Sequence, residues 1–90
     1  MALDVGTKRI GIAVADSAIK IAIPLITIDN DETQESAIKQ IIQLISKEEI
    51  DILVVGLPRN QSGEETPQSV YTKEFVENFK YAVDKISFQD

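Results

Sequence analysis

Residues 1–16 read Met-Ala-Leu-Asp-Val-Gly-Thr-Lys-Arg-Ile-Gly-Ile-Ala-Val-Ala-Asp, which is two short apolar segments joined by a polar turn. Apolar segments of this length on either side of a glycine-containing turn predict a β-hairpin. We predict strands over residues 1–5 and 9–16, with the turn at Gly6-Thr7-Lys8.

Asp4 stands near the end of the first predicted strand, beside groups that suit a phosphate-binding site. Mg²⁺ accepts oxygen ligands and is often held by only one or two carboxylates beside substrate phosphates. Gly6 and Gly11 permit backbone conformations and close approaches that a side chain would block. The alternative role for Asp4 is structural, since aspartate often forms turns at strand ends. The pattern favours Asp4 as a metal ligand.

The polar residues of the turn are candidate substrate contacts. Thr7, Lys8 and Arg9 supply one hydroxyl and two cationic side chains, and we expect only one of the two cations to face the site. A solvated hairpin tip is the alternative for both cations. Thr7 can equally close the turn through its hydroxyl.

The composition restricts the chemistry that this chain can perform. It contains neither cysteine nor histidine, so thiolate metal sites and the commonest general base are excluded. Its hydrophobic content of 43% is typical of a folded globular protein rather than a disordered one. The net charge of −6 counts against non-specific nucleic-acid binding, although a local basic rim remains compatible with it. No apolar run approaches the roughly 20 residues of a membrane span, and no signal peptide is recognisable, so we expect a cytoplasmic protein without a membrane partner.

The remaining elements are predicted from apolar periodicity and from helix-start signals. Pro24 cannot donate a hydrogen bond to a neighbouring strand, so its strand should lie at a sheet edge or contain a bulge. The near-continuous apolar run over residues 50–55 predicts a strand covered on both faces. The predicted elements are a strand over 21–28, a helix over about 32–48, a strand over 50–55, a helix from Thr66-Pro67 to Val83, and a strand from Lys85 to Phe88.

This order, β-β-β-α-β-α-β, predicts an α/β protein with one mixed sheet. Strand–helix–strand connections are nearly always right-handed, so the last two strands should lie parallel to the first. Ligands bind at the carboxyl edge of such sheets. The topology therefore places Asp4, the pair Arg59 and Asn60, and Asp90 at one edge, where Arg59 and Asn60 become candidate substrate contacts.

Three motifs together resemble the YqgF/RuvX family of pre-16S rRNA nucleases, also described as Holliday-junction-resolvase-like. They are Asp4-Val-Gly-Thr-Lys-Arg-Ile-Gly-Ile-Ala-Val-Ala-Asp16, Ile23-Pro-Leu-Ile-Thr-Ile28 and Val54-Val-Gly-Leu-Pro-Arg-Asn-Gln-Ser-Gly63. The resemblance runs in order over essentially the whole chain, and the combination is far more specific than any one motif.

The resemblance implies a ribonuclease-H-like fold and a Mg²⁺- or Mn²⁺-dependent nuclease. The substrate it implies is the 5′ end of pre-16S rRNA, with ribosomal particles as partners and branched DNA as the alternative substrate. The family's first-strand aspartate corresponds to Asp4. Its strand-five motif would begin at Asp90, which makes Asp4 and Asp90 the implied catalytic and metal-binding residues.

The resemblance also implies that residues 1–90 are a single, incomplete ribonuclease-H-like domain, with the C-terminal part missing. We therefore expect this chain to be a weak or inactive nuclease, with part of one sheet face uncovered, as a monomer or weak homodimer. Two alternatives stay open. One is a non-catalytic nuclease-like module that binds RNA or protein, and the other is a fragment of an actin-like ATPase or kinase, whose phosphate-binding hairpin also reads Asp-x-Gly-Thr.

Overall fold

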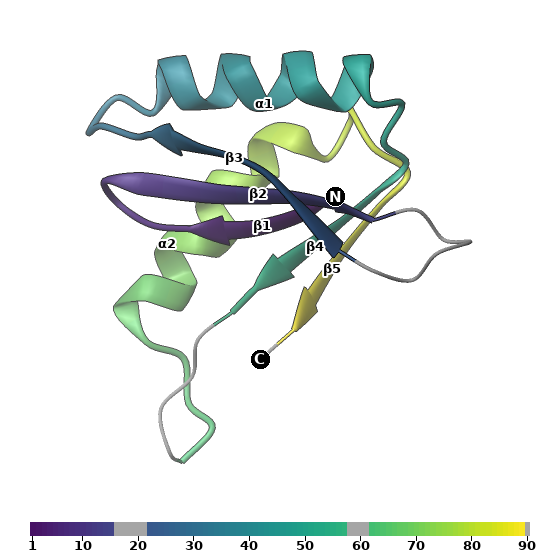
Figure 1. Ribbon diagram of the computed structural model, residues 1–90. Helices are drawn as coiled ribbons and strands as arrows, with labels where there is room; N and C mark the ends of the chain where they lie inside the picture. The colour runs from purple at the N-terminus through teal and green to yellow at the C-terminus, as the bar shows by residue number, and fades with distance from the viewer. Residues whose placement is uncertain (16–21, 58–61, 90) are drawn as a thin grey trace.

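The computed structural model describes residues 1–15, 22–57 and 62–89. Within these residues the chain forms one five-stranded sheet and two α-helices, an arrangement compatible with a ribonuclease-H-like fold (Figure 1). The elements in chain order are β1 (Ala2–Val5), β2 (Arg9–Ala15), β3 (Ala22–Asp29), α1 (Glu35–Lys47), β4 (Ile52–Gly56), α2 (Pro67–Val76), the 3₁₀ helix η1 (Glu77–Phe79) and β5 (Lys85–Gln89).

The sheet is mixed, with the strand order β3-β2-β1-β4-β5. β1, β2 and β3 form an antiparallel meander, whereas β4 pairs in parallel with both β1 and β5. The predicted parallel alignment of these three strands is confirmed. Pro24 lies in the edge strand β3, where the pairing with β2 shifts register between Ile12 and Ala13, as expected for a residue that lacks a backbone N–H.

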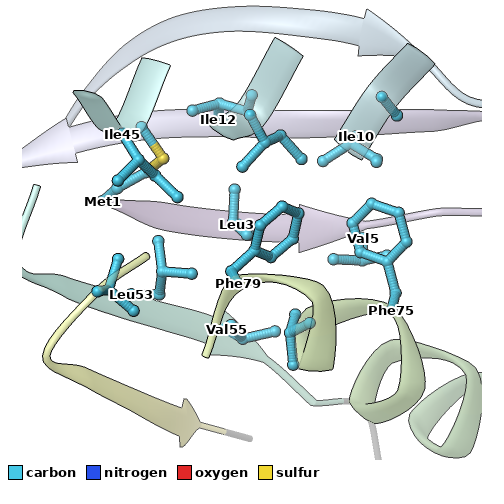
Figure 2. Close-up of a cluster of buried hydrophobic side chains, with 14 of the residues drawn as sticks. Met1, Leu3, Val5, Ile10, Ile12, Ile45, Leu53, Val55, Phe75 and Phe79 are labelled. Atoms are coloured by element: carbon cyan, nitrogen blue, oxygen red, sulfur yellow. The ribbon is translucent and has the colours of Figure 1, made fainter. Parts of the chain in front are cut away.

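The core lies between the sheet and the two helices. Alternate residues of β1, β2 and β4 point toward the helices, and the aromatic rings of α2 and η1 fill the space opposite them (Figure 2). Phe75 and Phe79 meet edge to face with their ring centroids 5.6 Å apart, a favourable aromatic geometry. The sheet and helix residues of this core include Leu3, Val5, Ile10, Ile12, Leu53, Val55, Ala37, Ile41 and Ile45.

The prediction that β4 is covered on both faces is wrong for the part of the chain that the structure describes. Leu53 and Val55 are fully buried, but Ile52, which alternates with them and faces the other side of the sheet, is 47% exposed. The reason is that α1 and α2 both pack on one face of the sheet. An apolar run does not distinguish a strand covered twice from one that presents apolar residues on an open face.

Both helices differ from their predicted bounds. α1 begins at Glu35 instead of residue 32, because the carboxylate of Asp31 accepts hydrogen bonds from the backbone N–H groups of Thr33 and Gln34 and holds them in a loop. α2 begins after Thr66, as predicted, but ends at Val76 and tightens into η1 instead of continuing to Val83.

The side chain of Asn78 explains the end of α2. Its amide Nδ2 donates to the carbonyl oxygen of Phe75 at 2.8 Å. This bond satisfies one of the carbonyl groups that the last helical turn leaves without a partner, and 3₁₀ turns are frequent at such ends. In the segments with described positions, no helix combines the length and apolar character that crossing a membrane requires.

Candidate active site at the carboxyl edge of the sheet

Asp4 lies on the face of the sheet that the helices leave open. It pairs with Gly11 of β2, and Gly11 pairs with Thr27 of β3, so a carboxylate, a glycine and a hydroxyl lie in a row across three strands. An open hollow of about 580 Å³ extends over this row, and its lining also includes Gly56 of β4 and Gln89 of β5. The carboxylate is exposed to this hollow and is therefore accessible to a ligand.

The position of Asp4 coincides with the point where the sheet divides. β1 pairs with β4 only through Ala2–Val54 and Leu3–Val55. From β1 the chain continues to β2 on one side, and from β4 it leads to β5 on the other. The connections from these two neighbouring parallel strands thus lead to opposite sides of the sheet. Such a topological switch point is the usual place for a ligand-binding crevice. Asp4 is the next residue of β1 beyond the last of these pairs.

The turn after β1 has a steric requirement for glycine at one position. Gly6 donates its backbone N–H to the carbonyl oxygen of Arg9 at 2.9 Å. A Cβ at residue 6 would lie 2.5 Å from that oxygen, so the prediction for Gly6 is confirmed. The same prediction is wrong for Gly11, where a Cβ would make ordinary contact with the Cβ of Asp4 at 3.7 Å.

The three candidate substrate contacts of the hairpin are all exposed. Arg9 stands two residues before Gly11 on β2, so the alternation of a strand places it on the same face as Asp4. It pairs there with Asp29 of β3. Thr7 and Lys8 form the turn itself. The structure thus brings Arg9 to the open face, and substrate contact by these residues stays a prediction.

The other predicted site residues cannot be placed. Arg59, Asn60 and Asp90 lie outside the described residues, so their expected position beside Asp4 stays a prediction. The described ranges contain no group of three or more acidic, histidine or cysteine side chains that could hold a metal ion. Among the described residues that line the hollow, Asp4 is the one carboxylate.

Among the described residues that line the hollow, Asp4 carries the anionic oxygen that a hard cation prefers. Thr27 and Gln89 offer further oxygen atoms, but each lies two strands away from Asp4, on opposite sides of it. Mg²⁺ and Mn²⁺ prefer such oxygen ligands, and Mg²⁺ is often bound by one or two carboxylates together with substrate phosphates. A single accessible carboxylate at the crevice is compatible with that mode of binding.

Asp31, in the connection after β3, has a structural role. The Thr33 hydroxyl donates to the Asp31 carboxylate at 2.7 Å, and the backbone N–H of Gln34 donates to it at 3.0 Å. These two hydrogen bonds hold the pKa of Asp31 below its ordinary value. The carboxylate therefore serves the connection that leads into α1.

Three polar residues near the turn were missed by sequence reasoning. The amide nitrogen of Asn30 donates to the carbonyl oxygen of Gly6 and to the Tyr71 hydroxyl, and the amide nitrogen of Gln68 donates to the carbonyl oxygen of Val5. Tyr71 also packs against the core, and nothing in the local sequence around Asn30 or Gln68 marks them. Their hydrogen-bond partners lie far away in the sequence, so no local signal could have found them.

The fold and the site define the class of this protein. It is an α/β protein with an open mixed sheet, in which a carboxylate at the dividing point of the sheet adjoins a glycine turn with hydroxyl and cationic side chains.

The comparison with known families goes one step further. The sequence profile of the RuvX family, described as "Holliday junction resolvase", matches residues 1–90. The chain belongs to the RuvX family.

Relatives with the name "Putative pre-16S rRNA nuclease" occur in several bacteria. A protein from Sulfurihydrogenibium sp. (strain YO3AOP1) is 48% identical over 80 residues, which cover 89% of this chain and 53% of the relative. A protein from Chloroflexus aurantiacus (strain ATCC 29366 / DSM 635 / J-10-fl) is 41% identical over 83 residues, which cover 92% of this chain and 54% of the relative. The chain thus spans about half the length of these relatives.

Proposed function

We propose that the complete protein is a metal-dependent nuclease that hydrolyses phosphodiester bonds at the 5′ end of pre-16S rRNA in the cytoplasm. The observation that carries the proposal is the accessible Asp4 carboxylate at the crevice of a RuvX-family sheet. The relatives' printed name supports the choice of substrate. We further propose that the fold is ribonuclease-H-like and that pre-16S rRNA within ribosomal particles is the physiological partner.

The hairpin supplies binding and orientation in this proposal. Asp4 would hold Mg²⁺ or Mn²⁺, and Asp90 is proposed as a second ligand. The metal would orient a water molecule and stabilise the leaving oxygen. Arg9, on the same face as Asp4, would bind a neighbouring phosphate group and so fix the strand across the crevice.

Further contacts come from the turn and from the loop after β4. Thr7 and Lys8 would bind the next phosphate group along the strand, and Arg59 and Asn60 are proposed to contact the substrate from the other side of the crevice. The basic side chains form a local rim on an acidic protein, which suits binding of a particular backbone path better than non-specific attraction.

The test is cleavage of a model RNA that spans the precursor 5′ end, by the complete protein with Mg²⁺ or Mn²⁺ and with a chelator. Asp4→Asn should lower kcat on the order of a hundredfold or more, because a bound metal contributes several kcal/mol to transition-state stabilisation. The matched control is Asp51→Asn, an exposed carboxylate before β4 at the opposite edge of the sheet, which should keep wild-type kcat. Equal activity of the two variants would disprove the role of Asp4.

A four-way DNA junction tested in parallel distinguishes the substrates. Cleavage of the junction without cleavage of the RNA would leave the nuclease proposal standing and remove the rRNA substrate. RNA binding without cleavage of either substrate would favour the non-catalytic module. The family match gives the actin-like ATPase no support.

The 90-residue chain by itself should be a poor nuclease. Two-metal hydrolysis relies on ions about 3.5–4 Å apart that several carboxylates hold. Among the described residues, Asp4 is the one carboxylate at the hollow. The measurement compares this chain with the complete protein on the same RNA. Equal metal-dependent rates would show that Asp4 needs no carboxylates beyond those of residues 1–90.

A further inference from the structure

We infer that Gln68, Asn30 and Tyr71 are positioning residues that hold the hairpin turn at the crevice. The inference rests on the proposed nuclease function, because the turn carries the proposed phosphate contacts Thr7 and Lys8. None of the three residues lines the hollow around Asp4. Each acts on the site through a backbone carbonyl group or through a neighbour.

Gln68 takes the place of a strand partner at the end of β1. Peptide groups of a strand alternate in direction, and the carbonyl oxygen of Met1 accepts from the N–H of Val54 in β4. The peptide groups of Leu3 and Val5 therefore face the same side, but among the described residues the pairing with β4 stops at Leu3. The amide nitrogen of Gln68 donates to the carbonyl oxygen of Val5 at 2.8 Å. A side chain of α2 thus donates the hydrogen bond to β1 at the position beyond its last pair with β4. The crevice between the two strands therefore stays open without leaving the Val5 carbonyl oxygen unpaired.

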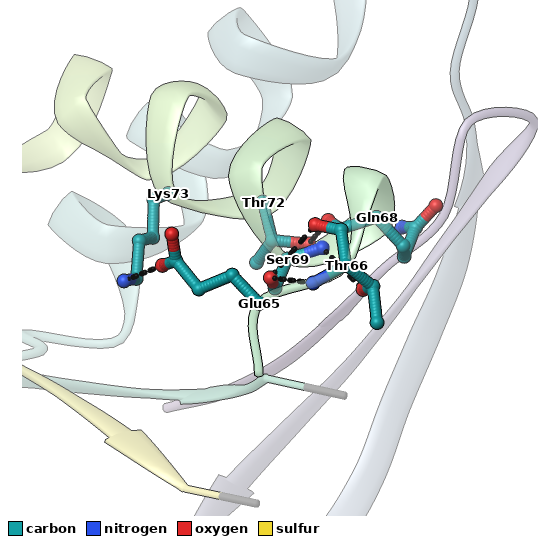
Figure 3. Close-up of polar contacts among 6 residues, drawn as sticks. All are labelled: Glu65, Thr66, Gln68, Ser69, Thr72 and Lys73. Carbon is teal, nitrogen blue, oxygen red and sulfur yellow. Dashed lines mark hydrogen bonds and ion pairs between the residues drawn. The ribbon is translucent and has the colours of Figure 1, made fainter. Parts of the chain in front are cut away.

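The first turn of α2 is itself fixed, so Gln68 has a rigid base (Figure 3). The Thr66 hydroxyl accepts from the backbone N–H of Ser69 at 3.1 Å, and the Ser69 hydroxyl accepts from the backbone N–H of Thr66 at 2.9 Å. This reciprocal capping satisfies two donors that a helix start would otherwise leave unpaired. The Thr72 hydroxyl also donates to the carbonyl oxygen of Gln68 at 2.9 Å, and both Ser69 and Thr72 are fully buried.

Asn30 holds the turn from the other side, after β3. Its side-chain nitrogen donates to the carbonyl oxygen of Gly6 at 3.0 Å, and its backbone N–H donates to the carbonyl oxygen of Lys8 at 2.8 Å. The same side-chain nitrogen donates to the Tyr71 hydroxyl at 2.9 Å. The Tyr71 ring stacks on the buried Phe75, with centroids 6.5 Å apart and planes inclined by 16°.

The three side chains therefore connect the turn to two separate parts of the fold. Successive carbonyl groups, those of Val5 and Gly6, bind side chains from α2 and from the end of β3. Catalysis depends on orientation, and a small misplacement of a binding group can lower the rate strongly even when the change lies outside the chemistry. We expect these contacts to set kcat as well as the local stability of the turn.

The test uses Tyr71→Phe and Gln68→Met in the complete protein. The first removes only the hydroxyl that Asn30 binds, and the second keeps the length of the side chain but removes the donor. Matched controls are Tyr81→Phe, at a residue that is 93% exposed, and Gln43→Met on the exposed side of α1. The measurements are amide hydrogen exchange at Gly6, and kcat and KM on the model RNA.

The expected result is about fivefold to tenfold faster exchange at Gly6 in both variants, the factor that corresponds to the loss of about one hydrogen bond. We expect kcat to fall about tenfold or more, with KM changed about twofold or less. The controls should match wild type in all three measurements. A contact that only completes the fold would change exchange and leave kcat at the level of the controls, and that outcome would overturn the inference, as would unchanged exchange.

Failure of the proposed function has a different signature. If the wild-type protein cleaves neither RNA nor junction, the nuclease proposal falls, and no role for these residues in kcat survives it. The exchange at Gly6 then still shows whether the three side chains hold the turn. The two failures are therefore distinguishable in one set of proteins.

Discussion

The two faces of the sheet differ in the kind of side chain that they present. The face under the helices carries branched residues such as Leu3 and Ile10, which are almost fully buried. Next to the carboxylate of Asp4, the open face carries the small residues Gly11 and Gly56, and farther away it carries apolar residues such as Leu25. Both sets come from the same strands and alternate residue by residue.

The comparison shows that the residues that stabilise the fold and the residues of the candidate site alternate along each strand. Large side chains on one face bury area against α1 and α2, which provides the hydrophobic stabilisation. Small side chains on the other face leave the strand ends bare around Asp4, which leaves space for a ligand. Substitutions at neighbouring positions of one strand should therefore have different consequences.

The largest difference is expected between Leu53→Ala and Val54→Ala. Leu53 is fully buried under the helices, whereas Val54 lines the open hollow. Loss of the buried side chain should lower the free energy of unfolding by about 2–5 kcal/mol, and loss of Val54 by about 1 kcal/mol or less. Urea denaturation of both variants measures this. Similar losses would show that the open face is as well packed as the covered one.

The next difference is expected between the two glycines of the hairpin. Gly6→Ala forces a Cβ against a backbone oxygen and should lower the free energy of unfolding by about 1–3 kcal/mol. Gly11→Ala places its methyl group in ordinary contact with Asp4 and should change stability by less than about 0.5 kcal/mol. Thermal or urea unfolding measures both. A large loss at Gly11 would mean that this part of the open face is closer packed than the strand register indicates.

A smaller effect is expected in solution behaviour. The 90-residue chain presents apolar side chains on its open face, and exposed apolar patches favour self-association. Leu25→Lys on the hollow should weaken association about tenfold, because burial of one such side chain contributes about 1.5 kcal/mol or more. Sedimentation velocity over a concentration series measures this. Ile42→Lys is the control, since Ile42 is similarly exposed but lies on α1. An equal effect of Ile42→Lys would place the contact elsewhere.

The smallest effect concerns the connection that carries α1 onto the covered face. The pKa of Asp31 is lower in the folded chain than in the unfolded chain, because Thr33 and Gln34 donate to its carboxylate. The stabilisation of the fold by this carboxylate is therefore fully present above the ordinary aspartate pKa of about 4. It is lost as the pH falls through the lower pKa of Asp31 in the folded chain. Asp31→Asn should reduce the loss of stability below about pH 4, measured by urea unfolding at several pH values. An unchanged pH profile in this variant would contradict the role of the carboxylate.

The hairpin and the parallel strands could be predicted because their signals are local or follow from general connection rules. Asp4, Gly6 and Arg9 stand next to the turn that arranges them, so spacing along the chain already indicates spacing in the fold. The edge position of β3 follows from Pro24, since a missing donor excludes central pairing.

The rest depends on contacts between distant parts of the chain. Gln68 and Val5 are 63 residues apart, and Asn30 and Tyr71 are 41 residues apart. No local pattern indicates such partners, because many polar residues in a first helical turn simply face water. The open face of β4 was missed for a related reason, since the apolar run does not contain the side on which α2 packs.

The strand order also has a consequence for synthesis of the chain. β1, β2 and β3 pair with their sequence neighbours, so the meander is complete once residue 29 has left the ribosome. Local pairings of this kind form fast because little loop-closure entropy opposes them. Phe75 and Phe79, however, cover the meander only after about fifty further residues have been made, at a rate of about 5–20 residues per second. The nascent meander therefore spends several seconds without the aromatic side chains that complete its covered face, although α1 follows β3 directly.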